Sequence, residues 1–279
     1  MTMKITIGCD PELFVTENGK PRSAWGLIPG TKEKPFDVDD GAVQVDGMAL
    51  EFNTRPVDNA DDFVLVTNSV LRQMREMVPD KYEFAIVPSV RFNGNHFRAQ
   101  PEEAKELGCT PDYNAYTLRE NKKPDNKTTM RTASGHIHIG FCEGADPNSD
   151  EHMLRCATLV KQLDAYLGLP SLLFDKDKKR RSMYGAAGCF RPKPYGVEYR
   201  VLSNAWLLSD DRKRFVFNQT IRAVNDLIAG IRLADKIGEL ALERTINVSD
   251  DYNASYLLQM YMGDKGKTEA EARALAKVG

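Results

Sequence analysis

Long apolar runs are missing from this sequence of 279 residues. No stretch of about 18 consecutive apolar residues occurs, so we expect no transmembrane helix. An excess of charge of one sign is missing too, because the formal net charge is only -2 at pH 7. A nearly neutral chain offers no general electrostatic attraction for nucleic acids or anionic membranes, and neither is expected as a partner. Any phosphate-binding site must therefore be local.

Cysteine motifs and glycine-rich phosphate loops are also missing. The five cysteines are scattered, and none forms a Cys-x-x-Cys pair. The segment Met1–Cys9 is too short for a signal peptide. We therefore expect reduced thiols, buried as small apolar side chains, in a cytoplasmic compartment. Since no Walker loop is present, a P-loop nucleotide site is not supported.

The spacing of the apolar residues predicts strands and helices in mixed order. Alternating apolar residues indicate strands, and recurrence every three or four residues indicates helices. An Asp46-Gly47 turn signal makes residues 43–54 a hairpin, and Asp58 is a candidate cap for the helix that follows. This order indicates an α+β fold with a largely antiparallel sheet. Strands are predicted at 4–16, 43–54, 82–90, 134–142 and 195–202, and helices at 58–78, 149–167 and 210–235, with two further helical stretches after them.

Other segments lack this periodicity. Residues 17–42 are rich in Gly, Pro, Lys and Asp, which indicates a turn and a long loop. Residues 91–133 are polar and contain several prolines, and a segment of this kind in a compact domain is usually a functional loop or lid. No composition break divides the chain. We expect residues 1–279 to form a single catalytic domain, with 91–133 as a lid or substrate loop and 236–279 as a helical C-terminal extension.

Two predicted strands carry acidic residues on one face. Asp10 and Glu12 are two positions apart, so on a strand they point to the same side. Glu51 and Asn53 share a face in the same way. Paired carboxylates can hold a hard divalent cation through oxygen. The alternatives are a surface turn at Asp10-Pro11, since proline favours edges and strand starts, and a solvent-facing edge at Glu51.

Two further strands carry histidine, glutamate and arginine. His136 and His138 share one strand face, an arrangement that brings two imidazoles toward one metal or phosphate. Buried structural histidines are the alternative. Glu198 and Arg200 share a face of the last predicted strand. The guanidiniums of Arg181, Arg191 and Arg200 suit phosphate or carboxylate, whereas the basic run Lys176–Arg180 reads as a solvated charge cluster.

Four of these segments together resemble a known family. They are Gly-Cys-Asp-Pro-Glu-Leu-Phe near the start, Leu-Glu-Phe-Asn in the second strand, Ser-Gly-His-Ile-His-Ile-Gly, and Tyr-Gly-Val-Glu-Tyr-Arg-Val-Leu-Ser-Asn. In this order they are similar to the phage-type COOH·NH2 ligases (amidoligases), which are related to glutamate–cysteine ligase and glutamine synthetase. The resemblance spans about residues 5–235.

The resemblance implies a glutamine-synthetase-like curved antiparallel sheet with helices packed on its outer face. Its concave face would hold ATP, two or three Mg²⁺ ions, a carboxylate and an amine. The implied activity is an ATP-dependent ligation through an acyl phosphate, in which metals and arginines neutralise converging anions. If the chain is phage-encoded, the compartment would be the host cytoplasm.

The resemblance also implies roles for individual residues. Asp10 departs from the Glu-x-Glu first strand of the broader superfamily and is one methylene shorter. The implied metal ligands are Glu12, Glu51, Glu198, His138 and Asp10; the implied nucleotide contacts are His136, His138, Arg200 and Tyr184; and the implied catalytic residues are Arg181, Arg191, Arg200 and Glu198.

Two other functions fit parts of the pattern. A metal-dependent hydrolase or oxygenase would use His136, His138 and a glutamate around one transition metal, but it leaves the arginines without a role. A non-catalytic phage accessory or binding protein would keep only the sheet. For the ligase, the expected partners are a small-molecule or peptide carboxylate and amine, with self-association into a homo-oligomer left open.

Overall fold

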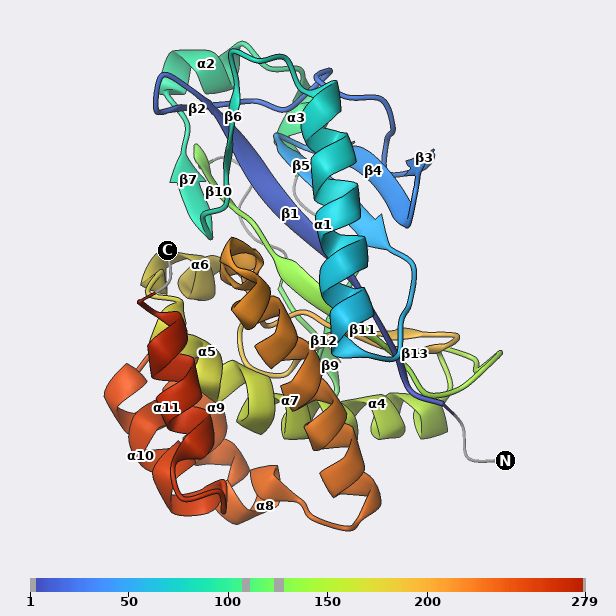
Figure 1. Cartoon of the computed structure of the whole chain (residues 1–279), viewed down its shortest axis with the longest axis vertical. Helices are drawn as coiled ribbons and strands as arrows, with labels where there is room; N and C mark the ends of the chain where they lie inside the picture. The colour runs from blue at the N-terminus through green and yellow to red at the C-terminus, as the bar shows by residue number, and fades with distance from the viewer. Residues whose placement is uncertain (1–3, 107–110, 123–127, 278–279) are drawn as a thin grey trace.

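The chain folds around one large antiparallel sheet, as a computed structural model shows (Figure 1). The structure describes residues 4–106, 111–122 and 128–277. Within these residues the main sheet runs in the order β3-β4-β5-β1-β11-β13-β12-β8-β9, and β2 and β6 pair with β1 outside that path. The prediction of an α+β fold with a largely antiparallel sheet is confirmed.

The strands that build the site lie in the middle of this order. β1 pairs with β5 on one side and with β11 on the other, and β11 continues through β13 to β12. The strands are β1 (Thr6–Glu17), β2 (Lys20–Arg22), β3 (Phe36–Val38), β4 (Gly41–Asp46), β5 (Ala49–Thr54), β6 (Glu83–Ala85), β7 (Ser89–Arg91), β8 (Tyr113–Asn114), β9 (Arg119–Glu120), β10 (Met130–Thr132), β11 (Gly135–Gly140), β12 (Cys189–Lys193) and β13 (Gly196–Tyr199).

Pro11 lies inside the central strand, so the surface-turn interpretation of Asp10-Pro11 is wrong. The N–H of Glu12 donates to the carbonyl of Ser134 on the β11 side. The nitrogen of Pro11 therefore faces the β5 side. Pairing with β5 begins only at Glu12, so no ladder hydrogen bond is lost, consistent with proline standing at the start of a paired segment.

Helices cover the apolar face of the sheet. α1 and α7 pack against each other and α1 lies over β4 and β5, while the C-terminal helices gather around α5 (Figure 1). The helices are α1 (Ala60–Met77), α2 (Gly94–Arg98), α3 (Glu102–Lys105), α4 (Asp150–Leu163), α5 (Leu169–Phe174), α6 (Lys178–Met183), α7 (Asp210–Ile228), α8 (Leu233–Ile237), α9 (Glu239–Asn247), α10 (Asp251–Tyr261) and α11 (Lys267–Leu275), with a π-helical turn η1 (Asp164–Gly168) and a 3-10 turn η2 (Asn204–Leu208).

Alternation along the strands separates the two faces. Ile7 and Cys9 of β1, Ile137 of β11 and Val197 of β13 belong to the main apolar core beneath the helices. The residues between them on the same strands point to the other face, where the polar positions are. On that face Phe97 of α2 and Ala104 of α3 cover the end near Phe14 and Ala49 in a smaller apolar cluster, and the polar positions lie beside it.

Several predicted boundaries were wrong. The helix predicted at 149–167 continues through η1 and α5 to Phe174, and the helix predicted at 210–235 stops at Ile228. Gly230, with φ of 77°, ends it in a left-handed conformation. β12 was not predicted, because Pro192 and Pro194 disguise its alternation.

The segment 91–133 is more regular than predicted. Its described parts include α2, α3 and β10, and β8 extends the main sheet beside β12. Short elements of two to five residues are too brief to show periodicity. The role of this segment as a lid, the single-domain organisation and the separate character of 236–279 stay predictions.

The basic run also differs from its interpretation as a solvated cluster. Arg180 lies on α6 and is almost fully buried. Its guanidinium donates to the backbone carbonyls of Ala133, Val201 and Leu202 at 3.1, 2.8 and 2.7 Å. These carbonyls lie just before β11 and just after β13, so Arg180 ties together the segments that flank the strands carrying the histidines and Glu198.

Replacing Arg180 by methionine should destabilise the protein. The change would remove the guanidinium donor from the buried carbonyls of Ala133 and Val201, whereas the carbonyl of Leu202 keeps the N–H of Gly135. Each unsatisfied group costs about 1–3 kcal/mol, so we expect urea denaturation of Arg180→Met to show a loss of at least about 2 kcal/mol. Arg72→Met, at an exposed position of α1, should change stability by less than about 0.5 kcal/mol. Equal losses in the two variants would contradict this role of Arg180.

Candidate active site

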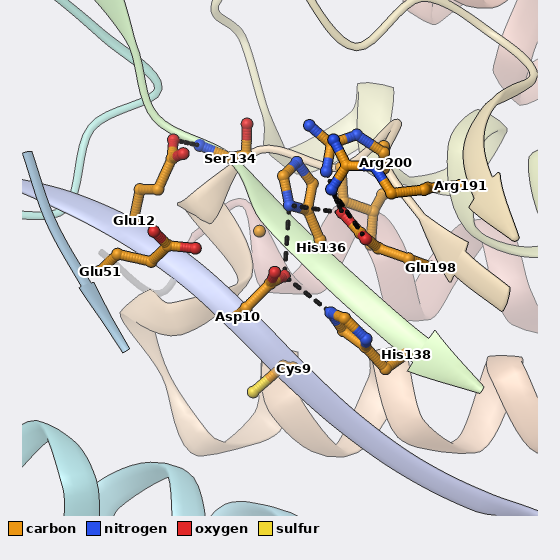
Figure 2. A network of polar contacts seen from close by, with 12 residues as sticks. Cys9, Asp10, Glu12, Glu51, Ser134, His136, His138, Arg191, Glu198 and Arg200 are labelled. Carbon is orange, nitrogen blue, oxygen red and sulfur yellow. Dashed lines mark hydrogen bonds and ion pairs between the residues drawn. The ribbon is translucent and has the colours of Figure 1, made fainter. Parts of the chain in front are cut away.

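A continuous row of polar side chains crosses the face of the sheet opposite the main apolar core (Figure 2). The register places Gln44 opposite Glu51, Glu51 opposite Glu12, and Asp10 opposite His136. Farther along, His138 stands opposite Glu198, and Glu198 opposite Arg191. The row therefore passes from carboxylates through imidazoles to guanidiniums. In Figure 2 Cys9 points away from the row, as alternation requires.

The acidic end of the row is formed by Glu12 and Glu51. An oxygen of Glu12 accepts a 2.8 Å hydrogen bond from the backbone N–H of Ser134. An oxygen of Glu51 accepts a 2.6 Å bond from the side-chain amide of Gln44. Glu51 is buried, so its interpretation as a solvent-facing edge is wrong.

Burial and mutual repulsion raise the proton affinity of this pair. Burial, together with the charge of Asp46, raises the pKa of Glu12 to about 7. Burial raises the pKa of Glu51 well above its usual range, and the charges of Asp10, Asp46 and Glu12 add to the effect. Like charges crowded out of water are stable only when protonated or when a cation joins them. The pair therefore has the electrostatics of a cation site.

Asp10 connects the acidic end to both histidines. Its Oδ1 lies 3.2 Å from Nδ1 of His136 and 3.1 Å from Nε2 of His138. These three atoms are buried, and none has a hydrogen-bond partner of acceptable geometry among the described residues. Three potential ligand atoms therefore converge at one point.

The two imidazoles differ electrostatically. Burial, helped by the charge of Arg200, lowers the pKa of His136 to about 4, so it is neutral at pH 7. Burial also acts to lower the pKa of His138, but Asp10 and Glu198 outweigh it and raise that pKa. Burial would raise the pKa of Asp10, yet His138 and His136 hold it well below its usual range.

Glu198 is enclosed by cations. Its side chain is 0% exposed, and its carboxylate lies 3.2 Å from Nη1 of Arg191 and 2.9 Å from Nζ of Lys193. Arg200 donates to it as well. A carboxylate buried this deeply needs such partners. Because three cations meet one carboxylate, positive charge remains for an anionic ligand.

The predicted metal ligands fall into two groups. Oxygens of Asp10 and Glu198 and a nitrogen of His138 lie within 4.8 Å of one another and could hold one ion. Glu12 and Glu51 lie on the other side of Asp10, beside each other across β1 and β5 (Figure 2). Asp10 is thus shared by both groups, and its shorter side chain does not remove it from the site.

Arg181 and Tyr184 border the same region. Arg181 is buried, donates to the hydroxyl of Ser171 at 3.3 Å and keeps one nitrogen without a partner in the described structure. The hydroxyl of Tyr184 accepts a hydrogen bond from Arg200 and lies 3.5 Å from Nε2 of His136. The structure therefore brings the arginines and Tyr184 into one neighbourhood.

A cavity of about 450 Å³ lies over this face. It is bordered by carboxylates from β1 and β5 and by guanidiniums from α6, β12 and the end of β13. His138 and Glu198 do not reach its wall. The predicted site residues that line it are Asp10, Glu12, Glu51, His136, Arg181, Tyr184, Arg191 and Arg200.

The segment 91–133 supplies another wall of the cavity. Asp112, Glu120 and Lys122 line it. Asp112 forms a 3.3 Å ion pair with Nε of Arg200, and the carbonyl of Pro111 accepts a 3.3 Å bond from Nε of Arg191. The segment therefore contacts the same arginines that face the cavity.

Some site residues were missed from the sequence. The two-residue turn at Gly47 and Met48 fixes the hairpin register, so Gln44 was predictable as the partner of Glu51. Lys193 shares a face with Arg191, but β12 was not recognised. Tyr195, which hydrogen-bonds Nδ1 of His138, lies in a turn that carries no sequence signal for that contact.

Comparison with known proteins supports the ligase interpretation. Residues 129–228 match the family model described as Phage phiEco32-like COOH.NH2 ligase-type 2. The match contains His136, His138, Arg191, Glu198 and Arg200, whereas Asp10, Glu12 and Glu51 lie outside it. The match confirms the resemblance over the two motifs that it contains, and it supports a carboxylate–amine ligase. No curated protein matches the chain in sequence.

Several solved structures are remotely similar. A novel glutamine synthase homolog is 12% identical, with 98% of this chain and 71% of that chain covered and a TM-score of 0.38. A bifunctional glutathione synthetase from Pasteurella multocida is 10% identical, with 98% and 51% covered and a TM-score of 0.36. GmaS without ligand is 12% identical, with 99% and 69% covered and a TM-score of 0.36. Likenesses this remote carry no argument about the activity.

Two remaining predictions concern membrane-spanning helices and the state of the cysteines. Among the residues with described positions, no helix combines the length and apolar character that a membrane crossing needs. Cys9, Cys142, Cys156 and Cys189 are free thiols, and burial raises the pKa of Cys9 to about 12. Cys109 lies outside the described residues.

Glu12→Gln should stabilise the metal-free protein above pH 7. A carboxyl group whose folded pKa is raised from 4.5 to about 7 destabilises the fold progressively as pH rises through that window. A tenfold change in proton affinity is worth about 1.4 kcal/mol. In EDTA at pH 8, urea denaturation should show Glu12→Gln to be at least about 1 kcal/mol more stable than the wild type.

Mg²⁺ should reverse the order of stability, so that the wild type becomes more stable than Glu12→Gln. The ion binds deprotonated carboxylates, so it should stabilise the wild type more at pH 8 than at pH 6 and have little effect on Glu12→Gln. Glu76→Gln, on the exposed end of α1, serves as the control and should respond to Mg²⁺ as the wild type does. A Glu12→Gln protein that is less stable than the wild type at pH 8 without metal would contradict the crowded-carboxylate interpretation.

Proposed function

We propose that the chain is an ATP- and Mg²⁺-dependent carboxylate–amine ligase that activates its carboxylate substrate as an acyl phosphate. The observation that carries this proposal is the composition of one cavity, with a crowded carboxylate pair on one side and arginines on the other. Phosphoryl transfer needs both, because metal ions and guanidiniums together neutralise the charge that spreads over the transferred group.

The donor set fits Mg²⁺ at the acidic end. Glu12 and Glu51, with Asp10 beside them, offer oxygen ligands in a buried, repulsive cluster that a hard cation would relieve. His138 and Glu198, with Asp10, form the group that could hold a further ion. Bound Mg²⁺ would supply charge neutralisation for the phosphate oxygens of the nucleotide.

The arginines and His136 fit the phosphate side. Arg191 and Arg200 present planar donors that suit phosphate oxygens, and Tyr184 holds the guanidinium of Arg200 in place. His136, neutral at pH 7 because its pKa is near 4, can offer a hydrogen bond without adding charge. Arg181, one of whose nitrogens has no hydrogen-bond partner among the described residues, suits the substrate carboxylate or a phosphate.

The proposed reaction has two steps. An oxygen of the substrate carboxylate attacks the γ-phosphorus of ATP, the bond from that phosphorus to the bridging oxygen breaks, and ADP leaves. The amine then attacks the acyl carbon, phosphate leaves, and the amine releases a proton as the amide forms. The chain's own residues hold the two substrates in line and exclude water from the acyl phosphate, which would otherwise hydrolyse.

One specific observation supports a competing function, a metal-dependent hydrolase or oxygenase. The group Asp10, His138 and Glu198 contains an imidazole, a ligand that suits transition metals better than Mg²⁺. A hydrolase or oxygenase would use such an ion, with His136 as a further ligand. It would give no role to Arg181, Arg191 or Arg200, and for this reason we favour the ligase.

Turnover measurements distinguish these functions. The protein, stripped of metal and resupplied with Mg²⁺, is incubated with ATP and a panel of amino acids and small peptides as carboxylates, with hydroxylamine as the amine. A ligase releases ADP and phosphate and yields a hydroxamate with at least one carboxylate. Absence of Mg·ATP binding by calorimetry would reject the ligase, and tight Zn²⁺ or Fe²⁺ binding without nucleotide would favour the hydrolase or oxygenase. Binding of ATP without turnover across the panel would favour a non-catalytic binding protein.

Glu198→Gln should abolish turnover. The substitution keeps the volume but removes the charge that positions Arg191, Lys193 and Arg200 and that contributes to the metal group. We expect kcat to fall by roughly 100-fold or more, the scale typical of lost electrostatic stabilisation. Glu269→Gln is the matched control, because Glu269 is also buried and bound to an arginine, Arg273, but lies on α11.

Both variants are first compared by circular dichroism and thermal denaturation. If the two variants lose stability equally but only Glu198→Gln loses turnover, Glu198 has a role in the site. Near-normal turnover in folded Glu198→Gln would remove Glu198 from the chemistry.

A further inference from the structure

Asp164 is a buried carboxyl group on the face of the sheet opposite the cavity. It begins the π-helical turn η1 between α4 and α5 and is 0% exposed. Among the described residues it has no cation within ion-pair distance; instead it accepts three hydrogen bonds. Burial raises its pKa to about 7, although these donors favour the charged form. Such a group is costly to bury, and single π-helical turns occur frequently at functional sites.

The three donors come from three separate segments. Oδ1 accepts from the hydroxyl of Tyr199 at 2.7 Å. Oδ2 accepts from the hydroxyl of Tyr116 at 2.8 Å and from the backbone N–H of Gly188 at 2.7 Å. One side chain therefore joins β13, the wall segment 111–117 and the turn 185–188 that leads into β12.

Each of these segments carries a residue that faces the cavity. Tyr199 stands between Glu198 and Arg200 on the chain. Gly188 precedes β12, which carries Arg191. Tyr116 follows Asp112, whose carboxylate pairs with Arg200.

The wall segment and the turn also bind each other directly. The N–H of Ala115 donates to the carbonyl of Gly188 at 2.9 Å. The N–H of Ala187 donates to the side chain of Asn247 on α9 at 2.8 Å. The turn is thus held from the helical side by two side chains, Asp164 and Asn247. A Cβ on Gly188 would lie 2.7 Å from the ring of Tyr116. The turn and the ring of Tyr116 are therefore in close contact, and a movement of one would displace the other.

We propose that Asp164 is a positioning residue: through Tyr116, Gly188 and Tyr199 it sets where the wall segment 111–117 and the guanidiniums of Arg191 and Arg200 stand around the cavity. This inference rests on the proposed function for its catalytic meaning, because it makes Asp164 responsible for the geometry of the phosphate-binding arginines. The structural statement, that Asp164 joins three segments, can be tested on the protein without ligand.

The test compares two tyrosine variants. Tyr116→Phe removes one of the three donors and nothing else. Tyr166→Phe is the control, because Tyr166 lies in η1 with Asp164, contributes to the apolar core against which Tyr116 packs, and gives its hydroxyl to a different carboxylate, Asp226, at 2.5 Å. Asp164→Asn is the second variant, since an amide offers one acceptor oxygen where the carboxylate uses two.

Hydrogen–deuterium exchange of the full chain without ligand is measured first. We expect faster exchange at 111–122 and 185–193 in Tyr116→Phe and in Asp164→Asn, and wild-type exchange there in Tyr166→Phe. Steady-state kinetics follow: KM for Mg·ATP should rise roughly tenfold or more in Tyr116→Phe, the scale of a small misplacement of binding groups, and should stay unchanged in Tyr166→Phe.

The outcomes separate the two hypotheses. Equal exchange at 111–122 and 185–193 in Tyr116→Phe and Tyr166→Phe overturns the proposal, as does faster exchange with an unchanged KM. A wild type that neither binds nor turns over Mg·ATP rejects the proposed function, and in that case the exchange comparison alone decides whether Asp164 holds the wall.

Discussion

The register of β1 against β5 and β11 is the constraint on which the rest of the site depends. It sets Glu12 opposite Glu51 and Asp10 opposite His136. Because side chains alternate between the faces of a strand, a slip of one residue would bury these groups under the helices and expose Cys9 and Leu13. The apolar residues that α1 and α7 cover therefore determine which polar residues meet on the other side.

The fold places crowded carboxylates at one end of the polar row and an excess of cations at the other. The carboxylates of Glu12 and Glu51 repel each other and form no ion pair with a cation among the described residues, while three cations surround Glu198. Asp10 and His136 lie between the two ends. Metal ions at one end and phosphates at the other would satisfy both, and a nucleotide complexed with Mg²⁺ brings the two together. This complementarity, more than any single residue, favours phosphoryl chemistry.

Much of the site could be predicted from strand periodicity. Residues two apart share a face whatever the fold, so Asp10 with Glu12, His136 with His138, and Glu198 with Arg200 were each recognised. Which strands are neighbours could not be read from spacing, because strand order depends on contacts between distant segments. The family resemblance supplied the idea that the four segments meet, and the structure shows that they do.

The residues that sequence reasoning missed depend on long-range contacts. Arg180 stands in a run of lysines and arginines, and only its burial against Val201 and Leu202 shows its structural role. Asp164 lies in an ordinary helical pattern whose π-helical turn has no sequence signature. Tyr116 lies in the turn after β8, a strand of two residues that is too short to display a period. Burial and hydrogen-bond partners, which no local pattern encodes, define these residues.

A crystal structure of the protein with Mg²⁺ and a non-hydrolysable ATP analogue tests the central claim most directly. We expect Mg²⁺ at Glu12 and Glu51 and the γ-phosphate between these carboxylates and the guanidiniums of Arg191 and Arg200. A nucleotide bound elsewhere, or a single transition metal held by His136 and His138 with no nucleotide in the cavity, would contradict it.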